Sequence, residues 1–138
     1  MAGFALGGGA PGAPDAGLRA ARLLLIDREA LAREVTDTLY AESPDLLARY
    51  GQAGREKCLQ DMRYNIEHLT PAVELGDGAM FAGYVQWLDS LLRARNVPTR
   101  DVVRCLHLLE DRCAVRYPRG EAEAIAAILR AGLAVLAA

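Results

Sequence analysis

The chain has 138 residues, of which 52% are hydrophobic and 25% are charged, and its formal net charge at pH 7 is −2. This balance is typical of one globular domain with a real core, and the interspersed charges give no basic stripe for a nucleic-acid partner. Apolar runs such as Leu23–Ile26 are far too short to cross a bilayer, and the N-terminus lacks the pattern of a signal peptide. We therefore expect a cytoplasmic protein with no membrane partner and reduced cysteines.

The predicted elements begin after a tail. Residues 1–17 are rich in Gly, Ala and Pro and are expected to be flexible, and residues 18–138 are expected to form one domain. Apolar residues four apart predict a helix over about residues 20–40, with Asp27 as a candidate N-cap. Ser43 and Pro44 are expected to start a short helix, with Ser43 as its cap, that ends at Gly51.

Four further helices are predicted between glycine and proline signals. They cover about residues 54–75, 79–95, 99–117 and 121–137. Asp77 and Thr99 are the expected N-caps of the second and third of these helices. No segment alternates polar and apolar residues over a useful length, so strands are not expected. Helical periodicity and short loops predict an all-α domain, either a globin-like sandwich or a bundle.

One face of the helix predicted over residues 54–75 carries a thiol, a carboxylate, an amide and an imidazole. At about 100° per residue, Cys58, Asp61, Asn65 and His68 occupy neighbouring positions on that helix. A solvated face has the same appearance, so spacing alone leaves both interpretations open. Cys105 and Cys113 lie about 12 Å apart along a later helix, which is too far for a disulfide, and we interpret both as structural.

Several collinear blocks resemble the phycobiliproteins, whose chromophore helix carries a Cys-Leu-Arg-Asp-Met segment. The similar blocks are Leu39–Leu47, Cys58–Met62, Thr70–Val73, Gly76–Asp77, Val97–Pro98 and the final helix from Gly120. The resemblance covers roughly residues 30–137. It implies a globin-like helical fold and, as the cofactor, a linear tetrapyrrole (a bilin) such as phycocyanobilin, biliverdin or a related compound.

The resemblance also implies roles for single residues. Cys58 matches the cysteine that forms a thioether to ring A of the bilin, and Asp61 matches the carboxylate that accepts hydrogen bonds from the central pyrrole N–H groups. Arg55 and Lys57 are candidates to hold the two propionates and, with Arg63, to lower the pKa of Cys58. The other residues expected to contact the bilin are Met62, Tyr64, Asn65, His68, Leu69, Phe81, Tyr84 and Trp87.

Two departures narrow this resemblance. The family's arginine two residues after the cysteine is Gln60 here, and the two N-terminal helices that pair antenna subunits have no clear counterpart. We therefore expect a phycobiliprotein-type globin domain without those pairing helices. The expected function is a bilin carrier or sensor linked to bilin metabolism, similar to the bilin-binding globins that occur with bilin-synthesis enzymes. Such a protein would be a monomer or homodimer, with those enzymes as candidate partners.

Two other functions stay open at this stage. A haem globin needs an iron-binding histidine, and His68 on the Cys58 helix leaves that option open although the helix over residues 79–95 has none. A globin that binds no pigment and acts as a dimerising sensor is the second alternative. An enzyme is not expected, because Cys58 and His68 are about 15 Å apart along one helix, too far for a nucleophile and its base.

Overall fold

The computed structural model of the protein describes residues 13–137, which form five helices and no strand. The helices are α1 (Ala13–Glu42), α2 (Asp45–Leu75), α3 (Gly78–Ala94), α4 (Thr99–Arg116) and α5 (Arg119–Ala137). The predicted all-α, globin-like class is therefore confirmed. None of these helices is apolar over enough of its length to cross a membrane.

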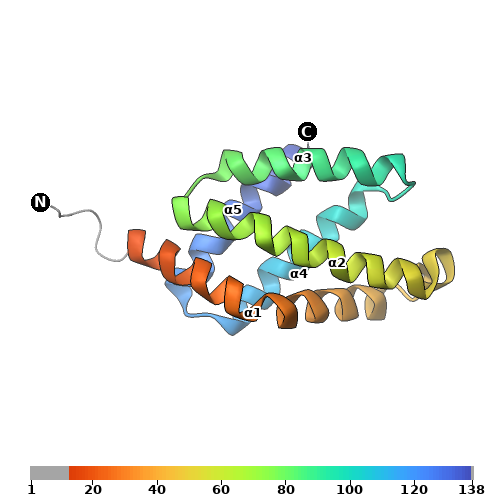
Figure 1. Ribbon diagram of the computed structural model, residues 1–138, viewed down its shortest axis with the longest axis horizontal. Helices are drawn as coiled ribbons and strands as arrows, with labels where there is room; N and C mark the ends of the chain where they lie inside the picture. The colour runs from red at the N-terminus through yellow and green to blue at the C-terminus, as the bar shows by residue number, and fades with distance from the viewer. Residues whose placement is uncertain (1–12, 138) are drawn as a thin grey trace, which may run out of the picture.

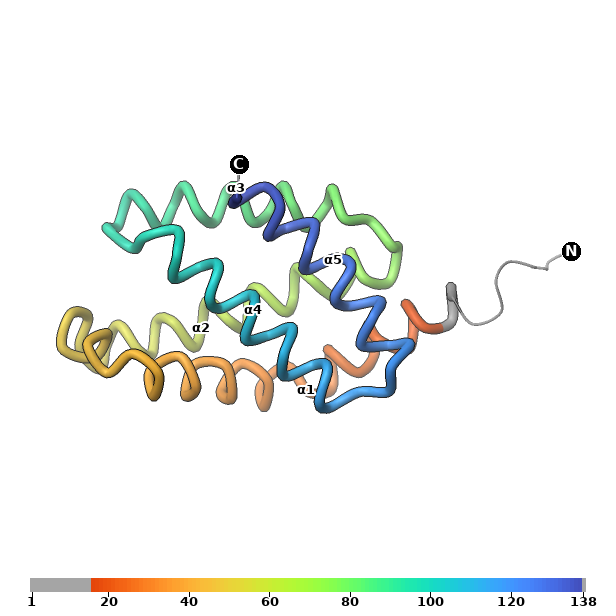
Figure 2. The backbone as a smooth tube through the Cα atoms, turned by 180° about the vertical axis from the view of Figure 1, so that it is seen from behind, coloured from red at the N-terminus to blue at the C-terminus, as the bar shows by residue number. Residues whose placement is uncertain are grey.

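The helices form two layers. α1, α2 and α3 lie side by side in one layer, and α4 and α5 cross behind them (Figure 1). Figure 2 shows the same arrangement from behind, with α4 and α5 in front. α1 packs mainly against α2, and α3 packs mainly against α5. The core between the layers contains fully buried side chains from every helix, among them Leu31, Ile66, Phe81, Leu106 and Leu129. Burial of each stabilises the fold by roughly 1.5–3 kcal/mol.

α2 bends sharply at Gly51, where φ is 72° and ψ is −176°. This backbone conformation is accessible almost only to glycine, since a side chain would clash with the backbone. The predicted end of a short helix at Gly51 is confirmed, although the following helix starts directly and the two halves form one bent element. Tyr50 and Gly54 flank the bend.

The break between α2 and α3 is also as predicted. Gly76 ends α2 in the left-handed conformation, with φ of 64°. The Asp77 carboxylate accepts a hydrogen bond from the Met80 backbone N–H at 3.1 Å and caps α3. Both features depend only on neighbouring residues, which is why the sequence indicates them.

Three other predicted caps are wrong. Asp27 lies inside α1, where its carboxylate accepts a hydrogen bond from the Tyr117 hydroxyl at 2.8 Å. Ser43 precedes α2, but no side chain caps that helix. Thr99 begins α4, yet its hydroxyl donates to the Asp89 carboxylate at 2.7 Å. In two of the three cases, the side chain that was expected to act locally is hydrogen-bonded to a residue from another part of the fold.

The start of α1 also differs from the expected tail. Residues 13–17 are helical, and residues 1–12 lie outside the described part of the chain. Gly17 lies against α2 so closely that a Cβ there would be 3.0 Å from the Val73 carbonyl oxygen. The Arg19 guanidinium contacts the Glu121 carboxylate of α5 at 2.6 Å. Packing against two helices therefore extends α1 into a stretch whose composition favours disorder.

Candidate functional site

A cavity of about 260 Å³ lies where α2 bends and where the turn between α3 and α4 approaches it. Its walls come from α1, both halves of α2, the end of α3 and the start of α4, and they are mostly apolar. The polar and charged residues on these walls include Lys57, Cys58, Asp61, Arg95, Asp101 and Cys105. A few polar groups in an apolar enclosure are typical of a small-molecule site.

A groove of about 390 Å³ runs between α2 and α3. Aromatic rings form much of its wall. The His68 and Tyr84 rings are stacked, with centroids 4.0 Å apart and planes 8° from parallel, and the Trp87 ring centroid lies 6.0 Å from that of Tyr84. Tyr64 and Gln60 complete the α2 side, where the Gln60 amide donates to the Tyr64 hydroxyl at 3.1 Å. Such a wall suits a flat, conjugated ligand.

The cavity and the groove meet at Asp61. The residues that line both are Lys57, Asp61, Leu88 and Arg95. Within residues 13–137, the Asp61 carboxylate takes part in no hydrogen bond or ion pair. Burial raises the pKa of Asp61 above its usual range, and the charges of Lys57 and Arg95 oppose that rise. The structure thus holds an unpaired acceptor at the junction of two ligand-sized spaces.

The Cys58 sulfur lies among groups from two other helices. The Cys105 thiol lines the same cavity as Cys58, and its action as a hydrogen-bond donor to the ionised sulfur is the main reason that the pKa of Cys58 is lowered. Burial opposes this shift, and the hydroxyl of Thr36 and the charge of Arg55 assist it. The interaction with Cys58 and burial raise the pKa of Cys105 well above its usual value. Cys58 is therefore the thiol that ionises first, with Cys105 as its donor.

Comparison with known proteins identifies the family. A family model described as phycobilisome protein matches residues 13–132. The chain belongs to the phycobilisome protein family. No curated protein gives a significant match to it. Phycobilisome proteins bind linear tetrapyrroles and are pigment-binding proteins rather than enzymes, so membership supports a bilin in general as the ligand.

This phycobilisome-family chain brings most of the expected site residues together. Those that line the cavity or the groove are Lys57, Cys58, Asp61, Met62, Tyr64, Asn65, His68, Tyr84 and Trp87. Three of them form a connected set, because the Tyr84 hydroxyl donates to the Asn65 side-chain oxygen at 2.6 Å and the Asn65 amide contacts the Met62 sulfur at 3.3 Å. These contacts fix the wall between α2 and α3.

Arg55 is the expected site residue that lines neither space. Its guanidinium lies 2.7 Å from the Asp37 carboxylate and stacks over the Tyr40 ring at 5.1 Å. Leu69 and Phe81, which were also expected to contact the ligand, are fully buried in the core and line neither space. In each case the side chain packs against or pairs with residues of another helix. Spacing along α2 or α3 does not reveal these contacts.

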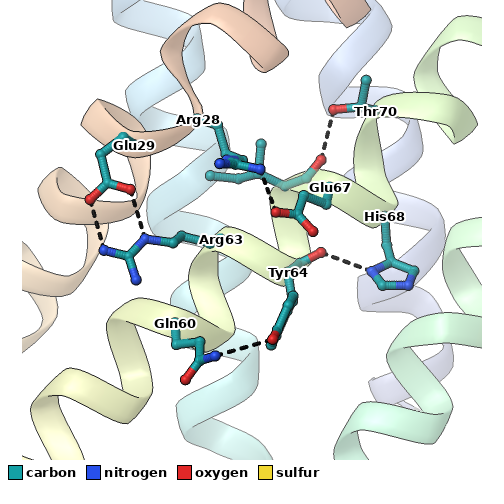
Figure 3. A network of polar contacts seen from close by, with 9 residues as sticks. Arg28, Glu29, Gln60, Arg63, Tyr64, Glu67, His68 and Thr70 are labelled. Atoms are coloured by element: carbon teal, nitrogen blue, oxygen red, sulfur yellow. Dashed lines mark hydrogen bonds and ion pairs between the residues drawn. The ribbon is translucent and has the colours of Figure 1, made fainter.

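The predicted electrostatics of Cys58 also need correction. Arg63 faces α1, where it makes two hydrogen bonds to the Glu29 carboxylate at 2.7 and 2.8 Å (Figure 3). Arg55 contributes less to lowering the pKa of Cys58 than Cys105 or Thr36 does. Cys105, which we interpreted as structural, is part of the site.

The sequence analysis missed several residues in or beside the site, among them Thr36, Arg95, Asp101 and Cys105. None of these four lies on α2: Thr36 is on α1, Arg95 directly follows α3, and Asp101 and Cys105 are on α4. A basic residue at the end of a helix was a weak signal for Arg95. The other three have no signal in their own segments, because only the packing of α1 and α4 on α2 brings them near.

The haem alternative gains no support from this geometry. No histidine lines the cavity, and His68, on the groove, is exposed, with its Nδ1 2.9 Å from the Tyr64 carbonyl oxygen. His107 is exposed on α4 and lines neither space. Among the described residues there is also no cluster of three or more His, Cys, Asp or Glu side chains suited to a metal ion.

Proposed function

We propose that this protein binds one bilin, covalently through Cys58, with the pigment running from the cavity into the groove. The observation that carries the proposal is the unpaired Asp61 carboxylate at the junction of the two spaces. A linear tetrapyrrole is long, apolar at its edges and rich in N–H donors at its centre. Along the path lie a thiol at one end, a hydrogen-bond acceptor in the middle and aromatic rings beyond. This order matches the order of the groups along a bilin.

The charges beside Asp61 support the same ligand. Lys57 and Arg95 border both the cavity and the groove and are available to hold two propionates. Neither forms an ion pair with another side chain in the described part of the chain, whereas Arg55 is bound to Asp37. Propionate binding therefore falls to Lys57 and Arg95 rather than to the Arg55 and Lys57 pair expected from the sequence.

The residues of the site would act on the pigment in distinct ways. Asp61 would accept hydrogen bonds from the central N–H groups and favour their protonated form, since a nearby anion stabilises added positive charge. Tyr84 and Trp87 would restrict rotation of the rings in the groove. The bilin itself would supply visible absorption. Cys58, with its lowered pKa, supplies the thiolate that attachment requires.

The proposed role is that of a carrier or sensor in bilin metabolism in the cytoplasm, not of a light-harvesting subunit. The outer wall of the groove supports this role, because Trp87 is 59% exposed and Tyr64 is 46% exposed. A pigment held there stays within reach of solvent and of a bilin-synthesis enzyme. An emitter for energy transfer needs closer enclosure, since freedom of the rings promotes loss of excitation as heat.

Co-expression with a haem oxygenase and a bilin reductase tests the proposal. We expect a purified protein with a visible absorption band, and zinc-induced fluorescence of the protein band on a denaturing gel. In Cys58→Ala, colour that survives acid–urea should be absent, whereas the control Cys113→Ala should keep it, because Cys113 is buried outside the cavity.

The other outcomes of the same experiment contradict the proposal in different ways. A pyridine haemochrome spectrum in place of a bilin spectrum would identify a haem globin. A colourless protein would favour the pigment-free sensor. A coloured adduct that persists in Cys58→Ala would show that the attachment residue is wrong.

A further inference from the structure

The surroundings of the Cys58 sulfur contain two groups that the proposed function does not yet use. Cys58 is on α2, Thr36 is on α1 and Cys105 is on α4, so three helices converge on one sulfur atom. Cys105 lines the same cavity as Cys58. Neither Thr36 nor Cys105 is close to Cys58 in sequence, and both depend on the packing of the layers to reach it.

The Thr36 hydroxyl is unusual in its lack of partners. Thr36 is 2% exposed, and its Oγ1 is one of two buried side-chain atoms in residues 13–137 without a hydrogen bond of ordinary geometry. The other is Oδ2 of Asp101, on the wall of the cavity. Buried polar atoms are nearly always paired, so these two exceptions require an explanation.

We infer that Thr36 and Cys105 are positioning residues that donate hydrogen bonds to the ionised sulfur of Cys58 and so prepare it for thioether formation. The assignment of a bilin as the reaction partner rests on the proposed function, whereas the presence of the two donors does not depend on it. A hydroxyl that has no good acceptor beside a neutral thiol gains a strong one when that thiol becomes a thiolate.

The attachment step balances without an oxidant. Cys58 releases its proton to water, and its sulfur electron pair forms a C–S bond to the exocyclic carbon of an ethylidene or vinyl group on ring A. The electron pair of that C=C bond takes a proton from water at the neighbouring carbon. Cys105 and Thr36 keep their own protons throughout and act only as donors.

The charges around Cys58 agree with this division of roles. The hydrogen bond from Cys105 is the largest cause of the lowered pKa of Cys58, and the hydroxyl of Thr36 also lowers it. Cys105 keeps its proton because hydrogen bonding and burial raise its pKa. The ionisable groups that act on this pair are Tyr40 from α1, Arg55 and Asp61 from α2, and Asp101 and Arg104 from α4.

Alkylation of the pigment-free protein tests the donors directly. The rate of Cys58 modification by iodoacetamide would be measured against pH by peptide mapping, on reduced protein with oxygen excluded. The variants are Cys105→Ala, which removes a donor, Cys105→Ser, which keeps one, and Thr36→Val, which removes the hydroxyl but keeps the β-branch. Thr38→Val is the matched control, since two residues turn a helical side chain by about 200°.

We expect the midpoint of the Cys58 profile to rise in Cys105→Ala and Thr36→Val. At pH 7 the rate should fall about 3- to 5-fold in Cys105→Ala and about 2-fold in Thr36→Val, because loss of thiolate is partly offset by its greater nucleophilicity. Cys105→Ser should stay close to the wild type, and Thr38→Val should match it. Circular dichroism of each variant verifies that the fold is retained.

Two results would overturn the inference, namely equal midpoints in all variants, or modification of Cys105 before Cys58. Parallel co-expression with bilin-producing enzymes separates the two proposals. Shifted midpoints with no coloured adduct in the wild type would support the donors and contradict the bilin proposal. Equal midpoints with a coloured wild-type adduct would contradict the donors and leave the bilin proposal standing.

Discussion

On the side of α2 that faces α1, Arg63 is paired with Glu29, and Glu67 accepts a hydrogen bond from Arg28 at 2.5 Å (Figure 3). On the side that faces the cavity, the Asp61 carboxylate has no partner within residues 13–137. Both sides contain charged residues at similar helical spacing. The difference shows that a functional face of this helix is marked by the lack of partners, and not by charge itself.

The energetics of the two sides differ in the same sense. An exposed ion pair stabilises a fold by no more than about 1 kcal/mol, so pairing on the α1 side fixes geometry more than stability. The cavity side carries the half-buried charge of Asp61 and the unpaired buried Oδ2 of Asp101, which oppose folding. Natural chains retain such features where a ligand compensates for them.

The largest expected effect in this comparison comes from the bend that forms the cavity wall. Gly51→Ala should lower the free energy of unfolding by about 1–3 kcal/mol, because alanine is strained at a φ of 72° and a ψ of −176°. Chemical denaturation measures this loss. Gly83→Ala is the control, since Gly83 lies in open space within α3, and it should stabilise by about 0.5–1 kcal/mol. Equal effects at the two sites would argue against strain at the bend.

An intermediate effect is expected at the junction. In Asp61→Asn the pigment-free protein should be more stable at pH 7 by on the order of 1 kcal/mol, with an unfolding temperature about 3–6 °C higher. The folded-state pKa of Asp61 is raised, so its contribution to stability is present below its unfolded pKa and is lost as the pH rises through the folded pKa. The gain over wild type should therefore vanish in acid.

The same variant has a second readout when the pigment is present. Asp61→Asn should retain some attached bilin but show a shifted and weaker red band, because the anion beside the N–H groups is gone. Glu67→Gln on the opposite side is the matched control and should leave the spectrum unchanged. An unchanged spectrum in Asp61→Asn would remove Asp61 from its assigned role.

The smallest effect is expected on the paired side. Hydrogen bonding to Arg63 lowers the pKa of Glu29 to about 2. Glu29 therefore contributes stability above its unfolded pKa, and that contribution is lost as the pH falls toward 2. Glu29→Gln should differ slightly from the wild type at neutral pH and converge with it near pH 2, and added salt should reduce the difference. Urea denaturation across this pH range gives the comparison, and a difference that grows in acid would reverse the sign.

The bend at Gly51 and the break at Gly76 and Asp77 were the parts of the fold that could best be predicted from the sequence. Gly51 and Gly76 need backbone conformations that glycine supplies, and Asp77 caps a neighbour three residues away. These are local requirements, so a short segment reveals them. Thr99 was wrong as a cap because Asp89, on another helix, accepts its hydrogen bond. No local pattern reports that competition.

The candidate site divides along the same line. Residues on α2 and α3 were expected from spacing and from the family resemblance, because each helix carries its share of the wall in its own sequence. Cys105 and Thr36 could not be found in this way, since they reach Cys58 only through packing between helices. Arg55 illustrates the reverse case. Its position in the sequence suggested that it binds the ligand, but it forms an ion pair with Asp37 of α1.

The position of Trp87 makes its fluorescence a reporter of the groove. It is the single tryptophan of the chain, and it stands on the groove wall beside Tyr84. Its intrinsic fluorescence therefore reports on one place only, and energy transfer to a conjugated molecule in the groove would quench it. The intrinsic fluorescence of Trp87 should therefore report whether the groove is occupied, so that ligand binding and release can be followed in real time without a label.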